Sequence, residues 1–140
     1  MRLEAAMKWP WSKQTEKSGQ QGHMTLADVH DYIGSRYGVS PVKAFDEDPS
    51  IGVFARPDNG KWFVATKNIR CSSVGAAGDG RVDIVNLRLN PRDVAALRTR
   101  EGFRSAWHMN SNKWVTLLLD GSVADDEVRA LIDKSYAFMA

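Results

Sequence analysis

The chain contains a single cysteine, Cys71, among its 140 residues. One cysteine excludes a disulfide within the chain, and it excludes a thiolate metal cluster built from one copy of the protein. Because thiols stay reduced in the cytoplasm, the scarcity of cysteine favours a cytoplasmic setting.

Long apolar runs are missing as well. No stretch approaches the roughly 20 apolar residues that a membrane-spanning helix needs. Lys, Glu and Gln interrupt residues 1–22, where a secretory signal would be apolar. We therefore expect a soluble protein with no membrane partner.

The chain also lacks a large excess of charge of one sign. The net charge is +2 and the pI is about 8.8, which permits a nucleic acid or an acidic partner but requires neither. The hydrophobic content of 43% is enough for one globular domain with its own core.

The first 24 residues differ in composition from the rest. Trp9 and Trp11 are followed by a polar stretch without apolar periodicity, which cannot offset the entropy lost on ordering. We expect residues 1–24 to be a flexible extension and residues 25–140 to form the domain. In the alternative interpretation, the two tryptophans form a docking handle or a weak membrane-surface anchor.

Capping signals predict three helices. Thr25, with an acid three residues later, starts a helix that Gly38 closes. Asn90 followed by Pro91 starts a short second helix, which we expect to end at Gly102. Ser122, again with an acid three residues later, is expected to cap the last helix.

Apolar alternation and turn residues predict five strands, over residues 51–55, 61–67, 82–89, 103–109 and 113–119. In the second strand, alternation places Trp62, Val64 and Thr66 on one face and Phe63 and Ala65 on the other. Short turns between strands favour an α+β fold, with an antiparallel β-sheet and the helices on one face.

Several segments resemble the MmcQ/YjbR family. They are Asp58-Asn59-Gly60-Lys61-Trp62-Phe63, residues 82–87, Leu97-Arg98 with Gly102-Phe103, His108-Met109-Asn110 with Lys113-Trp114, and Leu119-Asp120-Gly121-Ser122 through Ser135-Tyr136. The resemblance covers about residues 25–138 and implies a fold of the CyaY/frataxin type. It also implies a DNA-binding role through a double-wing motif. The turn before Trp114 departs from the family pattern, with the lysine displaced to position 113.

Residues 88–114 carry six basic side chains against two acidic ones. Arginine and lysine neutralise phosphates and tryptophan stacks on bases, so this segment predicts a nucleic-acid-binding or ligand-binding face. Its candidate residues are Arg92, Arg98, Arg100, Arg104, Trp107, His108, Asn110, Asn112 and Lys113.

We expect a non-enzymatic protein that binds DNA through this face. The alternative is a module that binds a small planar ligand, such as a sequestered drug, or another protein through the same face. We expect Trp62 and Trp114 to belong to the core rather than to the binding surface.

Catalytic and metal-binding patterns are weak. His108 is the one histidine in a polar constellation, and no clear nucleophile adjoins it in the sequence. Asp46-Glu47-Asp48 is typical of a solvated loop, since hard cations need converging oxygens. Residues 75–80 lack the Lys-Ser/Thr of a phosphate-binding loop. We expect no catalytic residue, no metal and no cofactor.

Overall fold

The computed structural model describes residues 23–76 and 78–140, so Trp9, Trp11 and the rest of residues 1–22 lie outside the described residues. Within these ranges, no helix has the length and apolar character that a membrane crossing requires. The elements, in chain order, are α3 (Leu26–Tyr37), β1 (Gly52–Ala55), β2 (Trp62–Arg70), the 3-10 helix η2 (Cys71–Val74), β3 (Arg81–Arg88), α4 (Pro91–Leu97), β4 (Phe103–Ser105), β5 (Trp114–Leu118) and α5 (Asp125–Phe138).

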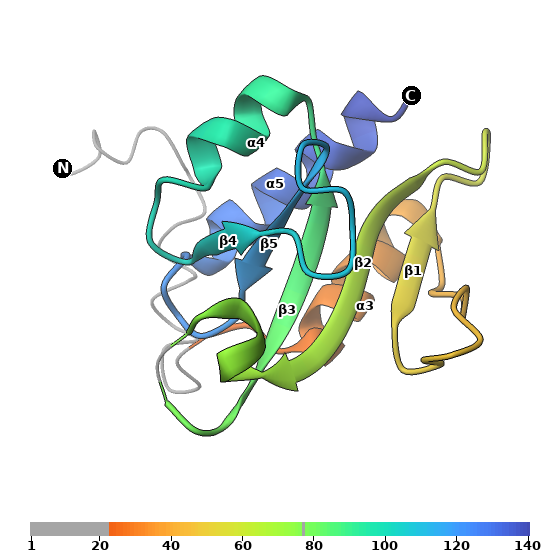
Figure 1. The fold of residues 1–140 in the computed structure, drawn as a ribbon. Helices are drawn as coiled ribbons and strands as arrows, with labels where there is room; N and C mark the ends of the chain where they lie inside the picture. Colours follow the sequence, from red (N-terminus) through yellow and green to blue (C-terminus); the bar gives the residue numbers. More distant parts are fainter. Residues whose placement is uncertain (1–22, 77) are drawn as a thin grey trace, which may run out of the picture.

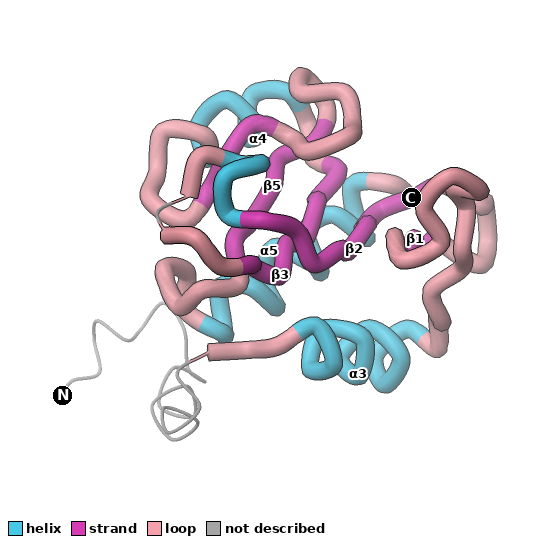
Figure 2. Tube along the Cα trace, turned by 60° about the horizontal axis from the view of Figure 1, so that its bottom comes forward, coloured by secondary structure: helices cyan, strands magenta, loops and turns pink. Residues whose placement is uncertain are grey.

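The strands form one antiparallel sheet in the order β1-β2-β3-β5-β4. Helices α3 and α5 lie behind it in the view of Figure 1, and the turned view of Figure 2 shows α3 running along one side of the strands. The main core lies between the sheet and the three helices, because apolar side chains of α3, α4 and α5 join those of the strands there. The expected α+β fold with helices on one face is confirmed.

Two of the three predicted helix starts are confirmed. At α3, the Thr25 hydroxyl accepts the Asp28 N–H and the Asp28 carboxylate accepts the Thr25 N–H, which completes a capping box. Gly38 ends this helix at φ 68°, a left-handed conformation that suits glycine. At α4, the side chain of Asn90 accepts the Asp93 N–H.

The predicted start of the last helix is wrong. Ser122 does not cap α5, because Ala124 occupies the N-cap position. Ser122 lies in a tight turn in which its N–H is donated to the Asp120 carboxylate (3.0 Å). The buried Val123 follows, and the helix begins only at Asp125. The side chain of Asp125 instead accepts the backbone N–H of Met24, 101 residues earlier in the chain (3.0 Å).

A β-bulge disrupts the alternation predicted for the second strand. Ala55 lies opposite Trp62 and Phe54 lies opposite Val64, so Phe63 is an extra residue between them. Phe63 packs edge-on against tyrosines of α3 and α5, whereas Trp62 packs against the other face of the sheet. The predicted grouping of Trp62 with Val64 is therefore wrong, and both faces of the sheet gain a large aromatic side chain.

The fourth strand is shorter than predicted. It ends at Ser105 rather than at residue 109, and residues 106–113 form a loop that crosses in front of the sheet (Figure 1). Two buried side chains hold the loop there: Thr116 accepts the Trp107 N–H (2.8 Å), and Asn86 donates to the Trp107 carbonyl (3.0 Å). The backbone of Trp107 is therefore bonded to side chains of β3 and β5 and not to the backbone of β5. We call the sheet face beneath this loop the front face.

Candidate ligand-binding site

The front face carries a hollow with a volume of about 500 Å³, which we call the front hollow. Its lining residues come from the end of η2 and from the chain after the start of β4. They are Ser73, Val74, Gly75, Arg104, Ser105, Ala106, Trp107 and His108. Three of the nine residues predicted from sequence, Arg104, Trp107 and His108, therefore meet at one hollow.

The guanidinium of Arg104 is fixed by backbone acceptors. Its Nε donates to the Val74 carbonyl (2.9 Å) and its Nη1 donates to the Phe103 carbonyl (2.9 Å). The bond to Val74 joins β4 to η2 across one side of the hollow. Both acceptors are uncharged, so these contacts orient the cation without neutralising it.

Trp107 and His108 form the aromatic side of the hollow. The ring centroids lie 5.0 Å apart, and the half-buried indole packs against the apolar front face. His108 has a left-handed backbone (φ 64°), which is uncommon for a residue other than glycine and turns the chain sharply. Its imidazole is 41% exposed, lies 5.2 Å from the ring of Phe45 and has the Glu47 carboxylate 4.0 Å away.

Five other predicted residues lie on a different part of the surface, which we call the α4 edge. Arg98 holds α4 against the following turn, because its Nη1 donates to the Ser111 carbonyl (3.0 Å). The Asn110 side chain accepts the Asn112 N–H (2.9 Å) and so shapes that turn. The α4 edge consists of Arg92, Arg98, Asn110, Asn112 and Lys113, all of them exposed except the half-buried Arg98.

Arg100 belongs to neither group. Its two terminal nitrogens bond the two carboxylate oxygens of Glu127 on α5 (2.7 and 2.8 Å), and its guanidinium lies over the ring of Phe103. The hydrogen bonds that Arg100 donates to Glu127 are the largest influence on its pKa and raise it. The predicted face is thus divided into the front hollow, the α4 edge and an arginine that ties β4 to α5.

The remaining sequence predictions near this surface have mixed outcomes. Trp114 is buried as expected, whereas Trp62 is only half-buried on the front face. In the acidic loop, hydrogen bonds from Ser50 and then from Lys67 lower the pKa of Asp48. Over residues 23–76 and 78–140, no three His, Cys, Asp or Glu side chains are grouped so that they could hold a metal ion.

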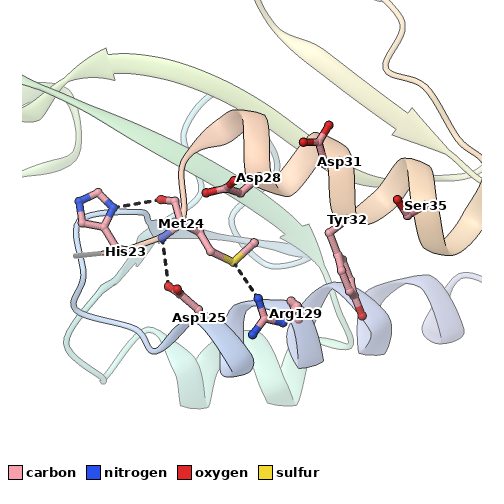
Figure 3. Close-up of a pocket in the computed structure, with 8 residues that line it drawn as sticks. All are labelled: His23, Met24, Asp28, Asp31, Tyr32, Ser35, Asp125 and Arg129. Carbon is pink, nitrogen blue, oxygen red and sulfur yellow. Dashed lines mark hydrogen bonds between the residues drawn. The ribbon is translucent and has the colours of Figure 1, made fainter. Parts of the chain in front are cut away.

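A second hollow, between α3 and α5, contains none of the predicted residues (Figure 3). We call it the helix hollow, and its volume is about 430 Å³. Its lining residues are His23, Met24, Asp28, Asp31, Tyr32, Ser35, Asp125 and Arg129. No local sequence pattern predicts this hollow, since its two walls are about 100 residues apart in the chain.

A tyrosine–carboxylate cluster lies beside the helix hollow and shares Tyr32 with its lining. Asp133 of α5 accepts hydrogen bonds from the hydroxyls of Tyr32 (2.7 Å) and Tyr37 (2.6 Å), and Arg36 lies 3.0 Å from the same carboxylate. Burial, followed by the hydrogen bond to Asp133, raises the pKa of Tyr37 to about 12. The same two causes raise the pKa of Tyr32. The cluster joins α3 to α5.

The fold and the front hollow define a class: a small α+β domain with helices on one face of an antiparallel sheet and a loop-covered hollow on the other. The family model described as YjbR matches residues 35–138. The chain belongs to this family, as its sequence motifs predict.

Known relatives agree with this assignment. The chain is 26% identical over 113 residues to the uncharacterized protein YyaQ of Bacillus subtilis, covering 81% of this chain and 96% of that one. The crystal structure of a Pseudomonas syringae protein has a TM-score of 0.75 at 34% identity and covers 80% and 96% of the two chains. Deinococcus radiodurans DR2400, assigned to DUF419, shares the fold with a TM-score of 0.62 at 21% identity over 82% and 78% of the chains.

Proposed function

We propose that this protein is a non-enzymatic binding module that takes a small planar ligand with an anionic group at the front hollow. The observation that carries the proposal is the meeting of Arg104, Trp107 and His108 around about 500 Å³ of space. This volume falls in the range of small-molecule sites, roughly 300–1,000 Å³.

The chemistry of the lining supports an anion rather than a cation. The described lining residues include a guanidinium, an imidazole and the hydroxyls of Ser73 and Ser105, and no carboxylate. An indole offers a flat apolar surface against which an aromatic ring can stack. A cation held in place before the ligand arrives reduces the entropy that is lost on binding.

The test is a titration with 2-naphthoate and with its uncharged analogue 2-naphthylmethanol, followed by tryptophan fluorescence. We expect saturable binding in which the carboxylate binds at least about 10-fold more tightly, the equivalent of about 1.4 kcal/mol. Arg104→Met should remove that preference and Trp107→Ala should abolish binding. Arg98→Met, a matched loss of charge outside the hollow, should leave binding unchanged.

A null result has a clear meaning in this design. If neither probe binds at millimolar concentration, or if Arg98→Met weakens binding as much as Arg104→Met does, the front hollow is not the site. Circular dichroism of each variant separates a lost contact from a lost fold.

DNA binding at the α4 edge is a second candidate, favoured by the contact of Arg98 with the Ser111 carbonyl, which joins the end of α4 to the turn that contains Lys113. Three cations, Arg92, Arg98 and Lys113, belong to the α4 edge, and such side chains neutralise phosphates in DNA complexes. Duplex binding through three phosphate contacts would give a slope of log K against log salt of about −2.7. Arg98→Ala should flatten the slope, whereas Arg104→Met should not. Absence of duplex binding at low salt would exclude this candidate.

A further inference from the structure

The described chain enters the domain through the helix hollow. Met24 is only 5% exposed, its N–H is held by Asp125, and its sulfur lies 3.8 Å from a guanidinium nitrogen of Arg129. Figure 3 shows the Met24 side chain between the two helices, with His23 at the mouth of the hollow. Residues 1–22 are therefore attached at this mouth.

The helix hollow is acidic and partly aromatic. Asp28 and Asp31 lie on α3, and Asp125 lies on α5, against one cation, Arg129. The ring of Tyr32 points from α3 toward α5 (Figure 3). A further hollow of about 270 Å³ adjoins it and shares Tyr32 and Arg129 as lining residues. Two neighbouring depressions thus lie along the groove between the helices.

The sequence preceding His23 has the complementary chemistry. Residues 1–22 carry four basic and two acidic side chains, and residues 8–13 read Lys-Trp-Pro-Trp-Ser-Lys. Pro10 disfavours helical geometry for Trp9, which it follows, so this stretch is biased toward an extended backbone. In an extended chain, Trp9 and Trp11 are about 6–7 Å apart, a spacing that suits two adjoining depressions.

The spacer between the tryptophans and the domain has a suitable length. Twelve residue steps separate Trp11 from His23, and the intervening sequence is rich in Ser, Gly and Gln. A spacer of this composition has a root-mean-square reach of about 20 Å. Helix α3, with 12 residues, is about 18 Å long. Tethering at this distance gives an effective concentration on the order of millimolar, so weak contacts are sufficient.

We infer that residues 8–13 of this chain bind in the groove between α3 and α5, with the indoles of Trp9 and Trp11 in the two adjoining depressions. Lys8 and Lys13 then bring two positive charges to a groove whose carboxylates include Asp28 and Asp31. The groove thus binds a basic, aromatic peptide, and that peptide is a segment of the same chain. The inference is independent of the ligand proposed for the front hollow.

Backbone amide NMR shifts of the full chain provide the test. The double variant Trp9→Ala/Trp11→Ala changes no residue of the domain, so we expect the domain to fold as in the unmodified chain. We expect shift changes across residues 28–35 and 125–130, and none in the hairpin turn at residues 57–60. The matched control, Thr15→Ala/Ser18→Ala in the spacer, should leave the groove amides unchanged. Lys8→Glu/Lys13→Glu should reproduce the tryptophan effect, and 0.5 M salt should weaken it at least twofold.

Shift changes limited to residues 23–26, or equal effects of the control, would overturn the inference. Groove shifts that grow with protein concentration would also overturn it, because the peptide would then come from a second copy. A spin label at Thr15→Cys in a Cys71→Ala background gives an independent reading. Groove amides should lose more than half of their intensity, and the loss should fall when Trp9 and Trp11 are replaced by Ala.

Discussion

At the scale of single residues, Gly102 shows how one position joins two parts of the fold. The sequence suggested that it ends the helix now seen as α4, but that helix ends at Leu97. Gly102 instead leads into β4 with a φ of 94°, directly beneath Ser122 and Val123. A Cβ at this position would lie 2.6 Å from the Val123 Cγ2 atom, so both the conformation and the space require glycine.

Gly102→Ala is therefore expected to reduce the free energy of unfolding by about 2–4 kcal/mol, combining backbone strain with overpacking. Urea unfolding measures the effect. Gly60→Ala is the control, because Gly60 also has a positive φ (74°) but a Cβ there meets open space. Its cost should stay near the 1–2 kcal/mol of strain alone. Equal costs for the two variants would contradict the steric part of this explanation.

His30 is a second residue whose environment predicts a measurable property. It lies on α3 with its Nε2 3.0 Å from the Thr66 hydroxyl, and burial lowers its pKa below the ordinary value. Because the folded protein disfavours the charged imidazole, the stability contributed by His30 is present above about pH 6.5, the value for an unfolded chain. This stability is lost as the pH falls below that value.

The unfolding midpoint in urea should fall between pH 7 and pH 5, and His30→Gln should reduce that fall. The comparison isolates His30, because the other histidines are present in both proteins. An identical pH dependence in the variant would show that His30 does not titrate differently in the folded and unfolded states.

At the scale of elements, local sequence signals predicted the helix starts at Thr25 and Asn90. Contacts between residues distant in the chain could not be predicted. The capping box of Thr25 and the Asn90–Pro91 helix start depend on residues within one turn, and both are confirmed. The length of β4 depends on Asn86 and Thr116, which are 21 and 9 residues away from Trp107, and it was overestimated. A sequence pattern contains no information about which distant side chain will bond a given backbone group.

The residues of the candidate site could be predicted from the sequence, but their grouping in space could not. Arg104, Trp107 and His108 were identified by residue type, but their common hollow also needs η2, which is about 30 residues earlier. The pairing of Arg100 with Glu127, 27 residues later, removed one expected cation from the predicted surface. Residue type thus identified candidates, and the fold decided which of them meet.

Thr116→Val tests how the loop over residues 106–113 is held. The variant keeps the shape of the side chain but removes the acceptor of the Trp107 N–H and the hydroxyl that donates to the Asn86 amide oxygen. Leaving that group without a partner should cost about 1–3 kcal/mol in unfolding free energy. Hydrogen exchange of the Trp107 amide should accelerate more than that of the sheet amides. Ser111→Ala, at an exposed position in the same loop, should leave the exchange rate unchanged.

At the scale of the whole molecule, Asp133 connects the first described helix to the last. Its carboxylate accepts from Tyr32 and Tyr37, which precede it by 101 and 96 residues. Tyr37 also stacks on Tyr136, with 3.7 Å between ring centroids, and Arg56 lies over that second ring. One cluster therefore joins α3, α5 and the chain between β1 and β2.

This cluster makes the fold sensitive to alkali. The pKa of Tyr37 is raised to about 12 in the folded protein, so its contribution to stability is complete below the ordinary tyrosine value of about 10. That contribution is lost as the pH rises from about 10 toward 12. We expect the urea midpoint to fall from pH 9 to pH 11 and to fall less in Tyr37→Phe. An unchanged slope in the variant would assign the alkaline loss to other groups.

The front face of the sheet is covered mainly by loops, whereas the opposite face is covered by helices. A helix that packs on a sheet must keep its period and its apolar stripe, so few of its positions can change without loss of the core. Loops tolerate insertions and substitutions far better. A protein built this way can acquire a new binding preference on one side while the other side preserves its architecture. In evolutionary terms, we expect the helical face to vary little among relatives and the looped face to carry most of the sequence change.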